Sequence, residues 1–265
     1  MNSRSIRSAL AGLAMAAALT TAACGGDGTA QPGAGASGTG VSGDVTVFAA
    51  ASLTESFTKL GKEFEAANPG TKVIFNFAGS SALATQITQG APADVFAAAS
   101  PATMKTVVDA GDADGTPTVF VKNQLVIAVP KGNPKGINTL ENLSKPDLKV
   151  ALCAEQVPCG AAAKKALDAA GVKVTPVTLE QDVKAALQKV KLGEVDAALV
   201  YRTDAKAAAA DVDGIEFPES AQAINDYPIV LLKQAPNKTA AQAFLAFVTS
   251  DRGKAVLGEA GFQAP

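Results

Sequence analysis

Small hydroxyl side chains follow two predicted strands of this 265-residue sequence, at points where a helix is expected to begin. Ser52 lies in the segment FAAASLT (48–54), and Ser80 lies in the segment FAGSSAL (77–83). The simplest use of serine at such a position is as an N-cap, whose oxygen accepts a backbone N–H of the helix. Two such turns favour a second use, because the free N–H groups and the dipole at a helix start attract negative charge. The sequence therefore predicts a shared anion site.

Three further segments are placed to add hydrogen-bond donors to this site. VPCG (157–160) and QDVK (181–184) each open a predicted helix and could offer backbone N–H groups. Tyr201 ends a predicted strand, where its phenol can either donate a hydrogen bond or pack against neighbours. Phosphate would also need an acceptor for its remaining hydrogen, and the candidates are Asp94 and Asp182. Neither lies in a motif that demands contact with an anion, so we expect phosphate to bind poorly.

Composition excludes several other kinds of chemistry. The sequence contains no histidine, so the usual Ser-His-Asp and Cys-His mechanisms are excluded, and zinc would have only cysteine or carboxylate ligands. No G-x-x-x-x-G-K-[ST] segment indicates a nucleotide site. Lys and Arg number 23 against 25 Asp and Glu, which leaves no basic surface for nucleic acid. A net-negative chain must therefore bind an anion through local neutral donors in a closed, dry cleft.

One catalytic motif matches by letter. Ser56 and Lys59 fit the S-x-x-K pattern of penicillin-recognising serine enzymes, but neither S-D-N nor K-T-G follows downstream. Both residues are expected on the polar face of an amphipathic helix, where serine and lysine are ordinary solvated residues. A secreted serine enzyme built on this pair stays the alternative from a different functional class.

The elements that position these residues alternate along the chain from Asp44 onward, which indicates an α/β fold. Strands are predicted at 45–49, 72–77, 94–98, 118–121, 125–129, 149–152, 172–174, 195–201 and 224–232. Helices are predicted near 53–68, 82–88, 101–110, 161–170, 181–191, 238–249 and 252–260. Two extended stretches flank a central α/β block, which favours two lobes: residues 44–122 with 225–265, and residues 123–224.

The N-terminus has the layout of a secretory signal peptide. Arg4 and Arg7 precede an uncharged run that ends at Cys24, and this run is shorter than the ~20 strongly apolar residues of a spanning helix. The small residues before Cys24 resemble a bacterial lipobox, which implies cleavage after residues 1–23 and lipidation of Cys24. Residues 24–43 are rich in Gly, Ser and Ala and are expected to be a flexible tether. We expect an exported lipoprotein anchored to the outer face of the cytoplasmic membrane, on its periplasmic or extracellular side.

Export also bears on the other two cysteines, Cys153 and Cys159. They are the only cysteines left after lipidation of Cys24, and the compartment is oxidising. We expect a disulfide between them, which would brace the loop that carries Cys159. The alternative is two free buried thiols.

Taken together, residues 44–265 resemble the periplasmic molybdate-binding proteins of ABC importers, the ModA family. The resemblance rests on a combination of motifs: FAAASLT (48–54), AGSSALATQI (78–87), QGAPADVF (89–96), VPCG (157–160) and LVY (199–201). It implies a type II periplasmic-binding fold with two lobes and crossing hinge strands. It also implies that two serine hydroxyls, two backbone amides and one phenol hold the oxyanion, and these carry over to Ser52, Ser80, Cys159, Val183 and Tyr201.

The same resemblance implies the ligand and the partners. The ligand would be molybdate or tungstate, with molybdenum present only as the bound oxyanion, and no cofactor or catalysis is expected. A monomer would deliver this ligand to a membrane permease and its ATPase. Tungstate should match molybdate because the two are nearly the same size, whereas the smaller sulfate should leave the donors too far away. A sulfate or other oxyanion binder stays the nearest alternative, with an iron(III)-binding protein and a surface adhesion module behind it.

Overall fold

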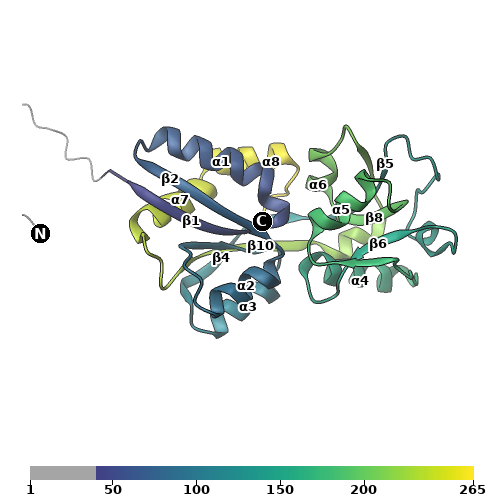
Figure 1. Cartoon of the computed structure of the whole chain (residues 1–265), viewed down its shortest axis with the longest axis horizontal. Helices are drawn as coiled ribbons and strands as arrows, with labels where there is room; N and C mark the ends of the chain where they lie inside the picture. The colour runs from purple at the N-terminus through teal and green to yellow at the C-terminus, as the bar shows by residue number, and fades with distance from the viewer. Residues whose placement is uncertain (1–39) are drawn as a thin grey trace, which may run out of the picture. The chain divides into compact units, whose positions relative to one another are not determined.

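The computed structural model describes residues 40–265, which belong to one compact unit (Figure 1). The predicted signal peptide, Cys24 and most of the predicted tether lie outside the described residues. Within residues 40–265, no helix combines the length and the apolar character needed to cross a bilayer. The described chain builds two five-stranded sheets flanked by helices, so the predicted α/β class is confirmed.

The first sheet, sheet A, has the strand order β2-β1-β3-β10-β4. Its strands β1, β2 and β3 are parallel, whereas β10 runs antiparallel to both β3 and β4. The strands are β1 (Gly43–Ala50), β2 (Thr71–Ala78), β3 (Val95–Ala97), β4 (Ala113–Asn123) and β10 (Asn225–Leu232). Its helices are α1 (Thr54–Ala67), α2 (Ser80–Thr88), α3 (Pro101–Asp109), α7 (Lys238–Thr249) and α8 (Asp251–Ala260). We call residues 40–123 and 225–265 half A.

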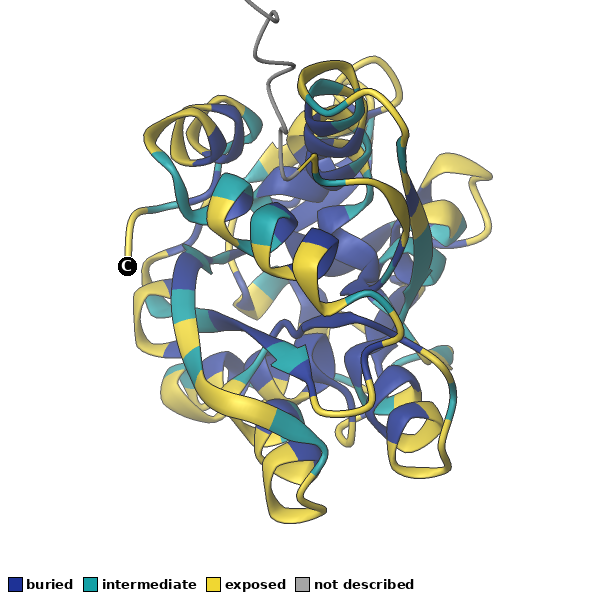
Figure 2. Cartoon of the chain, turned by 90° about the vertical axis from the view of Figure 1, so that its left-hand side faces the viewer, coloured by how far each residue is buried: buried dark blue, intermediate teal, exposed yellow. Residues whose placement is uncertain are grey.

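Helices cover both faces of sheet A because the side chains of its strands alternate. Val45, Val47 and Ala49 of β1 pack with apolar residues of α1, α7 and α8 on one face. Phe48, between them in sequence, packs with α2 and α3 on the other face. Figure 2 shows the result, with buried strands inside and helices that expose their outer sides.

The second sheet, sheet B, has the strand order β7-β6-β8-β5-β9. Strands β7, β6 and β8 are parallel, and β5 runs antiparallel to β8 and β9. The strands are β5 (Leu125–Pro130), β6 (Val150–Cys153), β7 (Thr178–Glu180), β8 (Ala197–Tyr201) and β9 (Val212–Ile215). The helices are α4 (Pro158–Ala170), α5 (Val183–Lys191) and α6 (Arg202–Ala207), with short 3-10 helices at Glu141–Ser144 and Pro218–Ala223. We call residues 124–224 half B.

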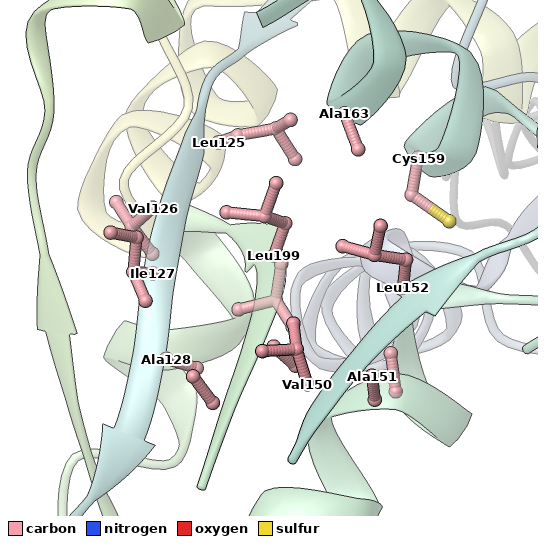
Figure 3. Packing of buried hydrophobic residues seen from close by; sticks show 14 of the residues in the cluster. Leu125, Val126, Ile127, Ala128, Val150, Ala151, Leu152, Cys159, Ala163 and Leu199 are labelled. Atoms are coloured by element: carbon pink, nitrogen blue, oxygen red, sulfur yellow. The ribbon is translucent and has the colours of Figure 1, made fainter. Parts of the chain in front are cut away.

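The core of half B consists mainly of small and branched aliphatic side chains. Figure 3 shows members of this cluster from three strands, β5 (Leu125), β6 (Val150 and Leu152) and β8 (Leu199), with Ala163 of α4 near Leu125. The chain passes between the two sheets at Gln124 and again at Ile224. These two crossings lie side by side, because Asn123 pairs with Asn225 in the ladder between β4 and β10.

The predicted strand at 172–174 is wrong. This run follows Gly171, which ends α4 in the left-handed conformation, and the backbone N–H of Val172 donates to the carbonyl of Leu167. Because the backbone there completes the helix end, the edge strand of sheet B forms later, as β7. Helix α6 and strand β9 were not predicted, since both are short and lack a clear apolar period.

Candidate ligand-binding site

A small cavity lies where the two sheets meet, and it has a volume of about 20 Å³. A water molecule needs roughly 10–15 Å³ by this measure, so the cavity suits one small group and not a sugar or a peptide. All five predicted site residues line it: Ser52, Ser80, Cys159, Val183 and Tyr201. Its remaining lining residues, which were not predicted as site residues, are Ala50, Ala51, Gly79, Ala99, Val157, Pro158 and Asp182.

The strand ends explain why these residues converge. Ser52 follows β1 in the short 3-10 helix Ala51–Leu53, and Ser80 is the first residue of α2 after β2. In half B, Cys159 follows β6, Val183 follows β7, and Tyr201 ends β8. The carboxyl ends of parallel strands meet at one edge of a sheet, and ligands commonly bind at such edges. Here the edges of both sheets face the same cavity.

The three hydroxyl groups at the cavity are buried and already hydrogen-bonded to the protein. Ser52 Oγ lies 2.8 Å from the phenol oxygen of Tyr227. Ser80 Oγ accepts the backbone N–H of Ala99 at 2.9 Å. The Tyr201 phenol oxygen accepts an N–H of the Asn225 side chain at 2.6 Å. The alternative role of the two serines as N-caps is not observed, because neither makes a side-chain cap hydrogen bond.

Two helix starts add backbone donors from half B. Cys159 is the second residue of α4, after Pro158, and Val183 is the first residue of α5. The first N–H groups of a helix have no acceptor within the helix, so they can serve a ligand. Asp182 caps α5, because its carboxylate accepts the N–H of Ala185 at 3.0 Å. Asp94 is remote from the cavity and binds the backbone N–H groups of Thr46 and Asn237.

A disulfide joins Cys153 at the end of β6 to Cys159 in the first turn of α4. It closes the loop that presents the Cys159 amide to the cavity. The next residue, Gly160, lies so close to this loop that a Cβ there would be 1.9 Å from the carbonyl oxygen of Ala154. The covalent bond and the close backbone contact together fix the position of this helix start.

Opposite α5, Gly79 brings the two halves into contact. A Cβ at Gly79 would lie 2.3 Å from the carbonyl oxygen of Gln181, which belongs to half B. Real Cβ atoms do not approach that closely, so only glycine fits. This part of the cavity wall therefore requires glycine at position 79.

No lysine or arginine of residues 40–265 lines the cavity. Among the residues that the structure describes, Asp182 is the only charged one that lines it. A cluster of charged groups lies beside Val183, where the Lys184 ammonium lies 3.0 Å from Asp204 and 2.7 Å from Glu55. Lys184 and Asp204 belong to half B and Glu55 to half A, so the cluster bridges the halves. One carboxylate oxygen of Asp204 also accepts the backbone N–H of Tyr201 at 3.2 Å.

Burial sets the proton affinities around the cavity. It raises the pKa of Asp204 to about 6, although Lys184 partly opposes this effect. Burial alone would lower the pKa of Lys184, but the Asp204 and Glu55 carboxylates outweigh it and raise that pKa. Burial also raises the pKa of both Tyr201 and Tyr227 well above the usual value, so each phenol keeps its hydrogen near neutral pH.

The Ser56–Lys59 pair is not assembled as a catalytic site. Ser56 is buried and its hydroxyl donates to the carbonyl of Leu53, so the prediction that it is solvated is wrong. Lys59 is exposed as predicted and pairs with Glu259 at 2.8 Å. Sequence reasoning also missed Tyr227 and Asn225, which hydrogen-bond to the cavity hydroxyls of Ser52 and Tyr201. Their only signal in the sequence was a place on a predicted strand.

Comparison with known proteins agrees with this geometry. Residues 45–263 match the family of bacterial extracellular solute-binding proteins. The molybdate-binding protein ModA of Mycobacterium tuberculosis H37Rv is 46% identical over 221 residues, covering 83% of this chain and 85% of that protein. ModA of Escherichia coli K12 is 32% identical and covers 83% of this chain and 89% of that protein.

Solved structures share the fold. The periplasmic molybdate-binding protein of Azotobacter vinelandii has a TM-score of 0.72 at 20% identity, covering 83% of this chain and 99% of that one. The substrate-binding domain of a putative molybdenum ABC transporter from Clostridium difficile has a TM-score of 0.63 at 27% identity, covering 84% and 100%. The fold is thus that of the type II periplasmic binding proteins, and the relatives are binding proteins rather than enzymes. The chain belongs to the bacterial extracellular solute-binding protein family, among its ModA members.

Proposed function

We propose that this protein binds molybdate in the cavity between its sheets and delivers it to an ABC permease and its ATPase. The observation that carries the proposal is the convergence of Ser52, Ser80, Cys159, Val183 and Tyr201, each with a neutral donor, on one cavity of about 20 Å³. The names of the 46% identical relatives support molybdate as the ligand.

Neutral donors suffice because the cavity is small and the residues that carry its hydroxyl groups are buried. Hydrogen bonds to a charged group contribute about 1.5–3 kcal/mol each, and they strengthen where water is excluded. A lysine or arginine at the cavity would favour any anion by charge alone. A set of fixed dipoles favours an anion whose oxygens match the positions of the donors, which suits a tetrahedral oxyanion such as molybdate or tungstate.

We propose further that residues 44–122 with 225–265 and residues 123–224 move as two lobes that close on the ligand. Contacts that span the cleft support this motion, because they would form only on closure. Glu55 of half A pairs with Lys184 of half B, and the Ser81 hydroxyl of half A donates to the Gln156 carbonyl of half B at 2.8 Å. Closure would strip water from the oxyanion and bring the donors of both halves within reach.

Titration calorimetry of the mature protein tests the ligand. Molybdate and tungstate should bind alike, sulfate more weakly and phosphate poorly. Ser52→Ala and Ser80→Ala should each weaken molybdate binding about tenfold to a hundredfold, because each removes one hydrogen bond to a buried charge. Tyr201→Phe should have a smaller effect of the same sign. Ser144→Ala is the matched control, since Ser144 is exposed and remote from the cavity.

Two outcomes would contradict the proposal. Wild-type affinity in both serine variants would remove the proposed site. Sulfate binding as tight as molybdate binding would reassign the ligand while leaving an oxyanion-binding protein.

The anchor at Cys24 and the monomeric state are also part of the proposal. The lipobox-like segment before Cys24 supports the anchor, as does the Bacillus subtilis relative named a putative substrate-binding lipoprotein, which is 32% identical over 83% of this chain. Cys24→Ser should move the exported protein from the membrane fraction to the soluble fraction. Retention of this variant at the membrane would contradict the lipid anchor, and light scattering checks the monomer.

A further inference from the structure

Each of the three cavity hydroxyls already has a hydrogen-bond partner in the protein, and for two of them the partner must be the donor. The Ser80 oxygen receives the backbone N–H of Ala99, and the Tyr201 oxygen receives an N–H of Asn225. A backbone N–H group and a side-chain NH2 group can donate hydrogen bonds but cannot accept them. In both bonds the hydroxyl is therefore the acceptor, and its own hydrogen is free for another partner.

The orientation of the Asn225 amide is fixed by its surroundings. Its nitrogen lies 2.8 Å from the carbonyl oxygen of Ala99, which only accepts, so the nitrogen and not the oxygen of the amide must lie there. One N–H of Asn225 serves Ala99 and the other serves the Tyr201 phenol at 2.6 Å. The Tyr201 hydrogen must then point elsewhere, and the phenol lines the cavity.

A similar chain of bonds leads to Ser52. The Asn123 side-chain oxygen accepts the backbone N–H of Gln124 at 3.0 Å, which places the Asn123 NH2 group on the other side. That NH2 group lies 3.4 Å from the phenol oxygen of Tyr227 and 2.9 Å from the hydroxyl of Thr203. Because Tyr227 receives an N–H, its own hydrogen is available for Ser52 Oγ at 2.8 Å. The Ser52 hydrogen is then left for the cavity.

We propose that Asn225 and Tyr227 are positioning residues: each donates to a cavity hydroxyl and thereby commits the hydrogens of Tyr201 and Ser52 to the bound anion. The two residues lie two positions apart on β10, so one strand orients a hydroxyl from each half. This inference rests on the proposed function above. It makes the cavity favour oxyanions that carry no hydrogen, because each hydroxyl already accepts a hydrogen bond from the protein and directs its own hydrogen to the anion.

Within the described part of the chain, Asp182 is the only carboxylate residue that lines the cavity. One of its oxygens accepts the N–H of Ala185 as the cap of α5, which holds this carboxylate against the start of the helix. Phosphate still carries a hydrogen near neutral pH. Its O–H group would therefore lie against hydrogen-bond donors of the cavity, where it needs an acceptor. Molybdate, which is fully deprotonated there, presents only acceptors.

The test is the ratio of molybdate affinity to phosphate affinity in Tyr227→Phe and Asn225→Leu, measured by calorimetry near neutral pH. We expect molybdate affinity to fall about threefold to tenfold in each variant. Phosphate affinity should stay the same or rise, because the freed hydroxyl can turn and accept a hydrogen. Asn76→Leu on β2, which does not line the cavity, is the control. Equal losses for both anions would mean a merely structural role and would overturn the inference.

Double-mutant cycles provide a second readout. If Tyr227 acts through Ser52, Tyr227→Phe should change molybdate affinity less than about twofold when Ser52→Ala is already present. Asn225→Leu should likewise have little effect in Tyr201→Phe. Additive losses in both cycles would overturn the inference. If Asn225→Leu fails to fold, the Tyr227 cycle still decides, because phenylalanine keeps the buried ring. Failure of the wild type to bind molybdate would refute the proposed function instead, so the two failures are distinguishable.

Discussion

The two halves reach stable cores with different side chains. Ten of the eleven phenylalanines belong to half A, and Phe217 is the only one in half B. In half A the rings contact one another, as Phe64 and Phe244 do at a centroid distance of 5.3 Å. Half B relies on alanine, valine and leucine and adds a disulfide. A half with few large side chains is thus braced covalently where it meets the ligand site.

In the site that we propose, the two halves also supply different donors. Half A contributes the hydroxyls of Ser52 and Ser80, which a single substitution removes. In our proposal half B contributes backbone N–H groups of Cys159 and Val183, which persist whatever the side chain is, together with the Tyr201 phenol. The comparison teaches that side-chain substitution tests the hydroxyl donors directly, whereas the amides of half B must be tested through the backbone that presents them.

The largest effect is expected from the aromatic core of half A. Phe244→Ala should lower the free energy of unfolding by about 3–5 kcal/mol, because the ring is fully buried and meets three other phenylalanines. Urea unfolding measures the change, with Leu199→Ala as the counterpart in half B. A loss below about 1 kcal/mol would show that half A does not depend on this cluster.

Gly79→Ala should separate binding from folding. The added Cβ would meet the Gln181 carbonyl only when the halves are closed, so molybdate affinity should fall at least about a hundredfold while the melting temperature of the free protein changes little. Gly258→Ala in α8 is the matched control, because a Cβ there meets nothing within 4 Å. Wild-type affinity in Gly79→Ala would mean that the halves bind without this close approach.

The buried Asp204 of half B predicts a pH dependence of stability. The pKa of Asp204 rises from 3.8 in the unfolded chain to about 6 in the folded protein. Between these values the folded protein holds a proton that the unfolded chain has lost, so stability falls as pH rises and levels off above about 6. Between about pH 4 and 7, the wild type should lose on the order of 2–3 kcal/mol relative to Asp204→Asn.

Denaturation at a series of pH values measures this difference. The exposed Asp168→Asn serves as the control. A constant difference between wild type and Asp204→Asn across the range would contradict the raised pKa. The variant also removes the partner of Lys184, but that charge stays constant over this range and does not change the slope.

The disulfide should give the smallest effect. Replacing Cys153 and Cys159 by serine should lower the free energy of unfolding by about 2 kcal/mol, as expected for a loop this short. Molybdate affinity should fall no more than about tenfold, since Gly160 still holds the helix start against Ala154. Reduction of the wild type with a thiol should reproduce both changes. Unchanged stability in the double variant would mean that the bond does not brace half B.

Much of the fold was predictable because it is encoded locally. The apolar period of residues 238–249 predicts α7 with the bounds that the structure gives. The serines that follow two predicted strands indicate the strand-to-helix turns that line the cavity. The failures have tertiary causes. Ser52 looks like a cap in sequence but bonds to Tyr227, which lies 175 residues away. Ser56 looks solvated but is covered by neighbouring elements. No local pattern encodes such pairings between distant segments.

The Tyr201 and Tyr227 phenols have an optical consequence. The chain has two tyrosines and no tryptophan, so its near-ultraviolet emission beyond the weak phenylalanine signal comes from these two rings. Both are buried, with ring centroids 5.9 Å apart, and one of them lines the cavity. The tyrosine fluorescence of the unlabelled protein therefore originates where the ligand would lie.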